Sequence, residues 1–347
     1  MKKRWFALCM CIVMLAGILT SCGTNTGKIK FGAAGLGGTY RVFGDTFANL
    51  VTSKNKKYKM EVKTTAGSAA NLRLLSDGYI QMAVAQTDLT NDAYERTGIF
   101  ENEKQHGGYS AVAALYTEAC QIVVKADSSI NTVEDLQDKR VSVGEEESGT
   151  EQNAKQILAA YGLNDSLVDE VNLDYSNAAE ELREGKIDAF FCTAGAQTTV
   201  IGELAKKCDI RLLSIDEKSA EKLKGTYKFY TDCTIPKETY NGQTEDVKTV
   251  GVKAVLLASD KLSADTVKDI TKILFENKQE LQYALPVDIS LDEKSAVEGI
   301  TIPFHKGAVA YYEECGMDGQ VLQTAASDQS RIVRQNPARK NHAEFRR

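Results

Sequence analysis

The chain has 347 residues, of which 43% are hydrophobic and 26% are charged, and its formal net charge is −6. This composition suits a globular protein with an ordinary apolar core, and the length is enough for two domains. A mildly acidic chain without a long basic block is a poor match for nucleic acid, so we expect no nucleic-acid partner.

The N-terminus has the pattern of an export signal. Residues 2–4 are Lys-Lys-Arg, and the apolar run WFALCMCIVMLAGILTSC follows them and ends at Cys22. A charged segment before an apolar one is typical of secretion, and a retained membrane helix is the alternative. The end of the run, LTSC, resembles a lipobox, which implies a lipid on Cys22. We therefore expect a lipoprotein signal over 1–22, a tether over 23–27 and an extracytoplasmic protein anchored to the cell membrane.

The first predicted elements after the tether alternate between strands and helices. Three runs predict strands: KIKFGAA, YKMEVKTT and YIQMAVAQ. Between them lie a glycine-rich loop with a helix that begins at Gly38, and a second helix that begins near Ser68. Strands that alternate with helices at this spacing predict βαβ units and a parallel sheet.

The same order of elements returns from residue 140. The runs RVSVG, VDEVNLDY and KIDAFFCTAG predict strands, and helices are expected from Gly149 and from Ser176. In this repeat Gly149 matches Gly38, and Ser176 matches Ser68. The repeat predicts two similar α/β lobes, and ligands of open α/β sheets bind at the carboxyl ends of the strands, where these helices begin.

Two long strand-like segments, at 109–127 and 247–259, are expected to connect the lobes. An amphipathic helix over 263–285 and the segment 305–316 would then pack back on the first lobe. The predicted fold class is α/β, with two lobes that are each a mostly parallel sheet flanked by helices, joined by two crossing strands. The expected boundaries are 28–118 and 247–325 for lobe 1, 119–246 for lobe 2, and 326–347 for a polar, disordered tail.

Cysteine and histidine give little support for catalysis or for a metal site. Five of the eight cysteines lie beyond the lipobox without CxxC spacing, and their disulfide state stays open. The three histidines, His106, His305 and His342, fall outside the cleft loops, so a nucleophile would lack a base. Cys192 ends a strand of lobe 2 and is expected to be buried there. We therefore expect no enzyme, no catalytic residue, no cofactor and no metal.

The glycine-rich loop GAAGLGG has three candidate ligands: a dinucleotide, a nucleotide phosphate or a carboxylate. A Rossmann fold would place an acid at the end of the second strand, but that strand ends in TTAG. A P-loop would need Gly-Lys-Ser/Thr, which does not follow. A carboxylate fits better, because a helix N-terminus offers unpaired N–H groups and partial positive charge. The alternative is that Thr39, Ser68, Thr150 and Ser176 only cap their own helices.

Six stretches between residues 28 and 320 together point to one protein family: GLGGTYRVFGDTFANLV, TTAGSAANLRLLSDGYIQMAVAQTD, LYTEACQIVVKADSSINTVEDLQDKRVSVGEEESGTEQNAKQIL, ELREGKIDAFFCTAGAQTT, DVKTVGVKAVLLAS and IPFHKGAVAYYEECG. In this order they resemble the TAXI-type solute-binding proteins of tripartite ATP-independent periplasmic (TRAP) transporters. The resemblance implies a type II-like periplasmic-binding-protein fold that closes on a small solute and delivers it to a permease with a large and a small subunit. An extracytoplasmic sensor subunit is the alternative, and a two-lobed enzyme is a further one.

The resemblance also implies a ligand and a site. The ligand would be a small carboxylate, either an amino acid such as glutamate or a dicarboxylate such as 2-oxoglutarate, and the protein a monomer. The implied ligand-binding residues are Gly37, Gly38, Thr39, Tyr40, Ser68, Gln86, Tyr116, Glu118, Ser148, Gly149, Thr150, Thr193 and Gly195. Arg41 either meets the ligand or points to solvent. Glu118 or the acidic trio Glu145–Glu147 is a candidate partner for a ligand ammonium, and the trio otherwise complements a helix dipole.

Overall fold

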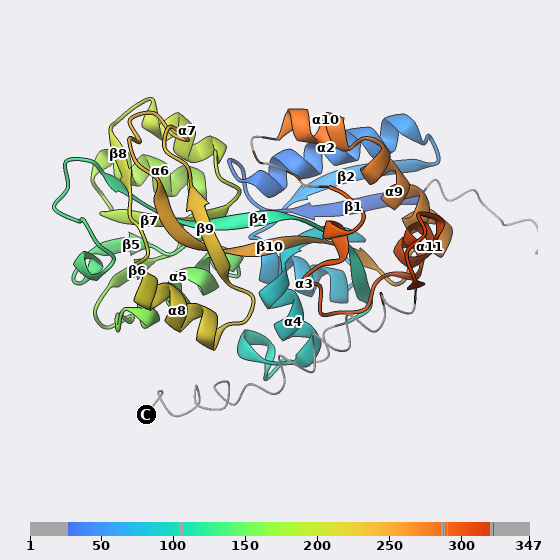
Figure 1. Ribbon diagram of the computed structural model, residues 1–347, viewed down its shortest axis with the longest axis horizontal. Coiled ribbons are helices and arrows are strands. Elements are labelled where there is room, and N and C mark those ends of the chain that lie inside the picture. The colour runs from blue at the N-terminus through green and yellow to red at the C-terminus, as the bar shows by residue number, and fades with distance from the viewer. Residues whose placement is uncertain are drawn as a thin grey trace, which may run out of the picture.

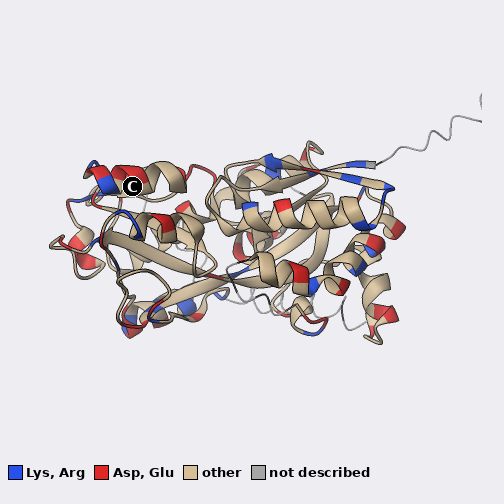
Figure 2. Cartoon of the chain, turned by 90° about the horizontal axis from the view of Figure 1, so that it is seen from above, with Lys and Arg blue, Asp and Glu red and all other residues tan. Residues whose placement is uncertain are grey.

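The fold is given by a computed structural model that describes residues 27–103, 107–285, 287, 289, 291–319 and 322. The expected signal over 1–22 with Cys22, the tether up to residue 26 and the tail over 326–347 lie outside the described residues. Across the described part of the chain, no helix is long and apolar enough to span a membrane. Basic and acidic residues are interspersed over the helices of both halves of the molecule (Figure 2).

One half of the molecule, which we call lobe 1, begins with two βαβ units (Figure 1). Its first elements are β1 (Gly27–Ala33), α2 (Thr39–Lys54), β2 (Tyr58–Thr64), α3 (Ser68–Ser76), β3 (Met82–Gln86), α4 (Thr87–Glu95) and the 3₁₀ turn η1 (Gly98–Phe100). Strand β1 pairs in parallel with β2 on one side and with β3 on the other. Helix α2 packs on this sheet because its apolar face is aromatic, with Phe43 and Phe47 against Phe31 of β1.

The other half, lobe 2, repeats the arrangement. Its elements are η2 (Glu134–Leu136), β5 (Arg140–Ser142), α5 (Gly149–Ala160), β6 (Asp169–Val171), α6 (Tyr175–Glu184), β7 (Ala189–Ala194), α7 (Thr199–Ala205), β8 (Ile210–Leu212), α8 (Glu217–Thr226) and β9 (Thr231–Ile235). Strand β5 pairs in parallel with β6 and β7. Strand β6 is shorter than the run VDEVNLDY predicts, because the chain turns after Val171 toward the start of α6.

Two long strands, β4 (Tyr109–Lys125) and β10 (Val247–Ser259), run through both halves (Figure 1). They are antiparallel to each other, and β10 also pairs with β3 while β4 pairs with β7. The strand order is therefore β2-β1-β3-β10-β4-β7-β5-β6, with β8 on β4 and β9 on β10. This mixed sheet flanked by helices confirms the expected α/β fold, while the exact lobe boundaries stay a prediction.

The C-terminal elements return to lobe 1. They are α9 (Ala264–Glu276), α10 (Lys278–Ala284), η3 (Ser295–Val297) and α11 (Lys306–Glu314). The single helix expected over 263–285 is wrong, because the chain leaves helical geometry at Asn277, whose φ is −116° and ψ 24°. The Asn277 side chain donates to the carbonyl of Ile273 at 2.8 Å, a local bond that competes with helix continuation.

The apolar core follows the same division. The largest buried cluster joins the β1–β3 sheet to the return helices, and its fully buried members include Phe31, Leu72, Leu274 and Tyr312. In lobe 2 two clusters cover opposite faces of the sheet, one containing Ile122 and Phe191 and the other Phe190 and Ile201. Each half therefore has its own core, and the loops at the carboxyl ends of its parallel strands face the other half.

Candidate functional site

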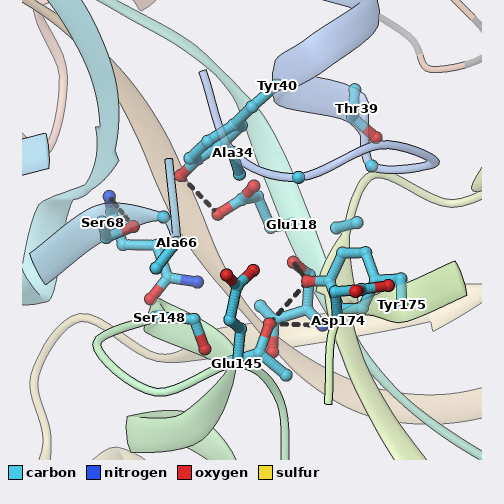
Figure 3. A pocket seen from close by; sticks show the side chains of 18 residues that line it. Ala34, Thr39, Tyr40, Ala66, Ser68, Glu118, Glu145, Ser148, Asp174 and Tyr175 are labelled. Carbon is cyan, nitrogen blue, oxygen red and sulfur yellow. Dashed lines mark hydrogen bonds between the residues drawn. The ribbon is translucent and has the colours of Figure 1, made fainter. Parts of the chain in front are cut away.

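A cavity lies between the lobes, at the carboxyl ends of the parallel strands of both halves (Figure 3). The space open to the centres of water molecules inside it is about 40 Å³, enough for a few waters. Its lining residues are Ala34, Gly35, Gly38, Thr39, Tyr40, Ala66, Gly67, Ser68, Gln86, Glu118, Glu145, Ser148, Gly149, Thr150, Asp174, Tyr175, Thr193 and Ala194. None of these lining residues is a lysine, an arginine or a histidine.

The N-terminus of α2 lines one end of the cavity. Gly38 is the N-cap residue, its backbone is extended, and no side chain caps the first turn. The N–H groups of a first turn have no acceptor within the helix, and the helix dipole places partial positive charge there. Thr39 is 3% exposed, and its hydroxyl oxygen has no hydrogen-bond partner among the described residues. This end of the cavity can therefore bind a carboxylate.

Glu118 supplies a buried carboxyl group to the same cavity. It lies on β4, is 2% exposed, and accepts a hydrogen bond from the Tyr40 hydroxyl at 2.9 Å. Burial raises the pKa of Glu118 to about 8, helped by the nearby charge of Asp88 and opposed by hydrogen bonds from Tyr40 and Gln86. No basic side chain lines the cavity, so the protein supplies no positive charge there to stabilise the ionised Glu118 carboxylate. A cation that enters the cavity would supply it.

On the lobe 2 side, the polar groups at the start of α5 are bonded to one another. The Ser148 hydroxyl caps the helix and accepts from the N–H of Glu151 at 3.0 Å. The Thr150 hydroxyl lies 2.5 Å from the Tyr175 hydroxyl and accepts from the N–H of Thr193 at 3.3 Å. The Tyr175 hydroxyl donates in turn to the carbonyl of Thr193 at 3.0 Å. Most of the polar groups on this side of the cavity therefore already have hydrogen-bond partners within the protein.

Two further carboxyl groups, Glu145 and Asp174, face the cavity from lobe 2 (Figure 3). They follow the carboxyl ends of the parallel strands β5 and β6, and they lie beside the glycine-rich loop. A side-chain carbon on Gly35 would be 3.6 Å from the Glu145 carboxylate and 4.0 Å from Asp174 Cβ. Partial burial raises the pKa of Glu145, and the negative charge of Asp174 adds to this rise.

The lobes touch directly around the cavity. The N–H groups of Ala69 and Ala70 donate to the carbonyl of Glu147, at 3.1 and 3.2 Å. The Glu147 carboxylate also pairs with Arg73 at 3.0 Å. A side-chain carbon on Gly149 would lie 2.2 Å from the amide oxygen of Gln86, so a larger residue here would displace the Gln86 side chain. These contacts describe a closed arrangement of the two lobes.

Most of the residues predicted for the site are brought together here. The lining includes Gly38, Thr39, Tyr40, Ser68, Gln86, Glu118, Ser148, Gly149, Thr150 and Thr193. Three predicted residues lie outside it. The carbonyl of Gly37 accepts from the N–H of Val200, Tyr116 lines a second hollow, and Gly195 is covered by Val287. A side-chain carbon on Gly195 would be 2.1 Å from Val287 Cγ1.

Several lining residues were not predicted, among them Asp174 and Tyr175. The repeat contains the missing signal, because Asp174-Tyr175-Ser176 follows its strand as Ala66-Gly67-Ser68 follows β2. The remaining unpredicted lining residues are Ala34, Gly35, Ala66, Gly67 and Ala194, and the sequence suggests Glu145 only as an ammonium partner or a dipole complement.

The expectation that four hydroxyl residues might cap their helices is wrong in every case. The N-cap residue lies one position before Thr39 in α2 and before Ser68 in α3. It lies two positions before Thr150 in α5 and before Ser176 in α6, where Ser148 and Asp174 are the caps. The Ser68 hydroxyl accepts instead from the N–H of Gln86 at 3.1 Å. These hydroxyl groups are therefore not committed to capping.

Other candidates lie away from the cavity. Arg41 pairs with Asp45 at 2.7 Å and does not line the cavity. Cys192 is fully buried in β7, where burial raises the pKa of its thiol to about 12, and His305 caps α11. The five cysteines that follow Cys22, which are Cys120, Cys192, Cys208, Cys233 and Cys315, are free. Within the described residues, no group of three or more acidic, histidine or cysteine side chains is placed to hold a metal.

Comparison with known proteins gives a family. The model of the NMT1-like family matches residues 31–316, which is most of the chain. Among solved structures, a protein from Bordetella bronchiseptica is 16% identical with a TM-score of 0.50, over 86% of this chain and 80% of that one. A putative L-cystine ABC transporter from Listeria monocytogenes is 15% identical with a TM-score of 0.48, over 76% and 98%. The alkanesulfonate-binding protein from Xanthomonas axonopodis pv. citri, bound to MOPS, is 16% identical with a TM-score of 0.45, over 86% and 83%. The match to the family model shows that the chain belongs to the NMT1-like family.

Proposed function

We propose that this protein is an extracytoplasmic solute-binding protein that encloses a small amino acid between its lobes and delivers it to a membrane permease. One observation carries the proposal. A single cavity combines an uncapped helix N-terminus with a buried carboxyl group that has no basic partner in the cavity lining. The first group suits an anion and the second suits a cation.

An amino acid in its zwitterionic form carries both complementary charges. Its carboxylate would accept hydrogen bonds from the first-turn N–H groups of α2 and from the Thr39 hydroxyl. Its ammonium would donate to Glu118. The positive charge of the ammonium would stabilise the ionised carboxylate, which burial otherwise disfavours. A dicarboxylate such as 2-oxoglutarate would bring a second negative charge toward Glu118, Glu145 and Asp174. Of the two ligand classes that the sequence suggests, we therefore favour the amino acid.

The proposed role needs closure of the lobes and no chemical step. A solute that contacts groups from both halves binds the closed arrangement better than an open one, so it shifts the population toward closure. The direct contacts between Glu147 and the start of α3 would then form on closing. A permease that distinguishes the closed form from the open form would receive only the loaded protein.

The receiving partner that we propose is a TRAP-type permease with a large and a small subunit. This part of the proposal rests on the resemblance to TAXI-type proteins across residues 28 to 320. The membrane anchor that we propose is a lipid on Cys22, in the LTSC run. Replacement of Cys22 by Ser should release the protein from membranes in detergent partition, whereas unchanged partition would argue against lipidation.

A thermal-shift screen tests the ligand class. The purified protein is mixed with amino acids, 2-oxo acids, sugars and nucleotides. A solute present at a hundred times its dissociation constant should stabilise the protein by about 2.7 kcal/mol. We expect shifts from amino acids and none from their 2-oxo counterparts. Shifts from sugars or nucleotides alone would refute the proposal, and shifts from 2-oxo acids alone would refute the role given to Glu118.

A further inference from the structure

The acidic lining of the cavity exceeds what one ammonium group requires. Glu118, Glu145 and Asp174 all line it, and no lining residue is basic. Glu118 comes from a crossing strand, whereas Glu145 and Asp174 come from loops of lobe 2. Figure 3 shows the side chains of Glu118 and Glu145 entering the cavity from opposite sides. If Glu118 holds the α-ammonium of an amino acid, two acids remain for the other end of the solute.

The two remaining acids differ in how far the protein satisfies them. One oxygen of Asp174 accepts from the N–H groups of Ser176 and Asn177, both at 2.9 Å, and the other accepts from the Asn177 amide at 2.6 Å. The Glu145 carboxylate has no hydrogen bond or ion pair among the described residues, although the residue is half-buried. Asp174 thus contributes mainly negative charge, and Glu145 has free acceptor oxygens.

A second polar group without a partner among the described residues lies on a residue that lines this cavity. Gln86 is 2% exposed, lines the cavity, and donates through its amide nitrogen to Asn153 at 3.0 Å. Its amide oxygen is buried and has no partner among the described residues. An oxygen acceptor in this state, like the Glu145 carboxylate, is complementary to a hydrogen-bond donor on the solute.

We infer that Glu145, supported by the charge of Asp174, selects the side chain of the bound amino acid: a distal amide, ammonium or guanidinium group is accepted, and a distal carboxylate is rejected. The inference rests on the proposed function and adds the substrate class. A distal donor would bond the free oxygens of Glu145. A distal carboxylate would meet two carboxyl groups in a partly enclosed space with no compensating base, where like charges repel strongly.

Titration calorimetry at neutral pH with matched pairs of solutes tests this selection. Glutamine and glutamate, and asparagine and aspartate, differ only in the distal group, and ornithine adds a cation. For the unmodified protein we expect the preferred amide to bind at least about tenfold more tightly than its acid. Glu145→Gln should reduce this ratio to within about threefold of one, and Asp174→Asn, which can still cap α6, should reduce it less.

Glu146→Gln is the matched control, because it removes the same charge from the neighbouring, exposed side chain, which does not line the cavity. It should leave the ratio unchanged. Three outcomes would overturn this inference but not the proposed function. They are tighter binding of the acid than of its amide, an unaltered ratio in Glu145→Gln, and binding of other amino acids when neither the amides nor ornithine bind. Absence of binding by every amino acid would overturn the proposed function as well, so the two failures are distinguishable.

Discussion

Thr39 and Thr150 hold the same position in two similar lobes, directly after a glycine at or next to the start of a helix that lines the cavity. Their surroundings differ. The Thr39 hydroxyl has no partner and its helix has no side-chain cap, whereas the Thr150 hydroxyl is bonded to Tyr175 and Thr193 and its helix is capped by Ser148. One side of the cavity therefore has polar groups without partners among the described residues, and the polar groups of the other side are bonded to one another.

This difference teaches that matched motifs in a repeated fold need not share a role. Substitutions on the side of Thr39 and Glu118 should weaken binding with little effect on stability. Substitutions on the side of Thr150 and Tyr175 should lower stability first, because they leave buried partners without hydrogen bonds.

The largest effect is expected for Glu118→Gln, which keeps the shape of the side chain and removes its charge. A hydrogen bond to a charged group contributes about 1.5–3 kcal/mol, so affinity for an amino acid should fall by about a hundredfold. Titration calorimetry measures this change, with Glu217→Gln on the exposed start of α8 as the control. Retained affinity would mean that the ammonium binds elsewhere.

The pH dependence of stability provides a second test of the same group. The pKa of Glu118 is raised from 4.5 to about 8, and burial raises the pKa of Asp88 to about 7. At pH values between the ordinary and the raised pKa of each group, the folded protein binds more protons than the unfolded chain. Stability therefore falls as pH rises through this range. Without ligand, the free energy of unfolding should decrease from about pH 5 to pH 8, and Glu118→Gln should flatten part of this decrease. A pH-independent curve in urea denaturation would contradict the burial of both groups.

The comparison itself is tested by Thr39→Val and Thr150→Val. Thr39→Val should weaken binding by about tenfold and leave the midpoint of thermal unfolding nearly unchanged. Thr150→Val should lower the free energy of unfolding by about 1–3 kcal/mol, because Tyr175 and the N–H of Thr193 lose a partner. Thr46→Val, on the half-buried part of α2, serves as the control for the loss of a hydroxyl. Equal effects of the first two variants on both quantities would remove the distinction between the two sides.

The smallest effect is expected at the contact between the lobes. Glu147→Gln removes the charge that pairs with Arg73 but keeps the backbone carbonyl that accepts from α3. Partly exposed pairs contribute about 0–1 kcal/mol, so affinity should fall by no more than about fivefold. Since Glu147 does not line the cavity, the loss would act through closure, and small-angle scattering with saturating ligand should still show compaction. A loss as large as that of Glu118→Gln would indicate direct contact with the ligand.

Much of the fold is predictable from the sequence because the repeat is local. The alternation of strands, glycine-preceded helices and two long apolar segments predicts the α/β fold and the edge at which Gly38 and Gly149 meet. The break at Asn277 was not predictable from the apolar periodicity, because it depends on a single side chain that bonds the preceding turn.

The site is less predictable, because its properties depend on contacts between lobes. Sequence pattern places Thr39 and Thr150 alike, and the contacts of Thr150 with Tyr175 and Thr193 distinguish them only in the folded protein. Gly195 follows the correct strand, but Val287, far along the chain, covers it. The absence of basic residues from the cavity lining, which favours an amino acid over a dicarboxylate, likewise appears only when all lining residues are assembled.

A crystal structure of the protein with its tightest-binding amino acid would test the central claim most directly. We expect the ammonium nitrogen within hydrogen-bond distance of the Glu118 carboxyl group and the α-carboxylate at the N–H groups that begin α2, near the Thr39 hydroxyl. A solute held in the reverse orientation, with its carboxylate at the start of α5 and no donor at Glu118, would contradict the account.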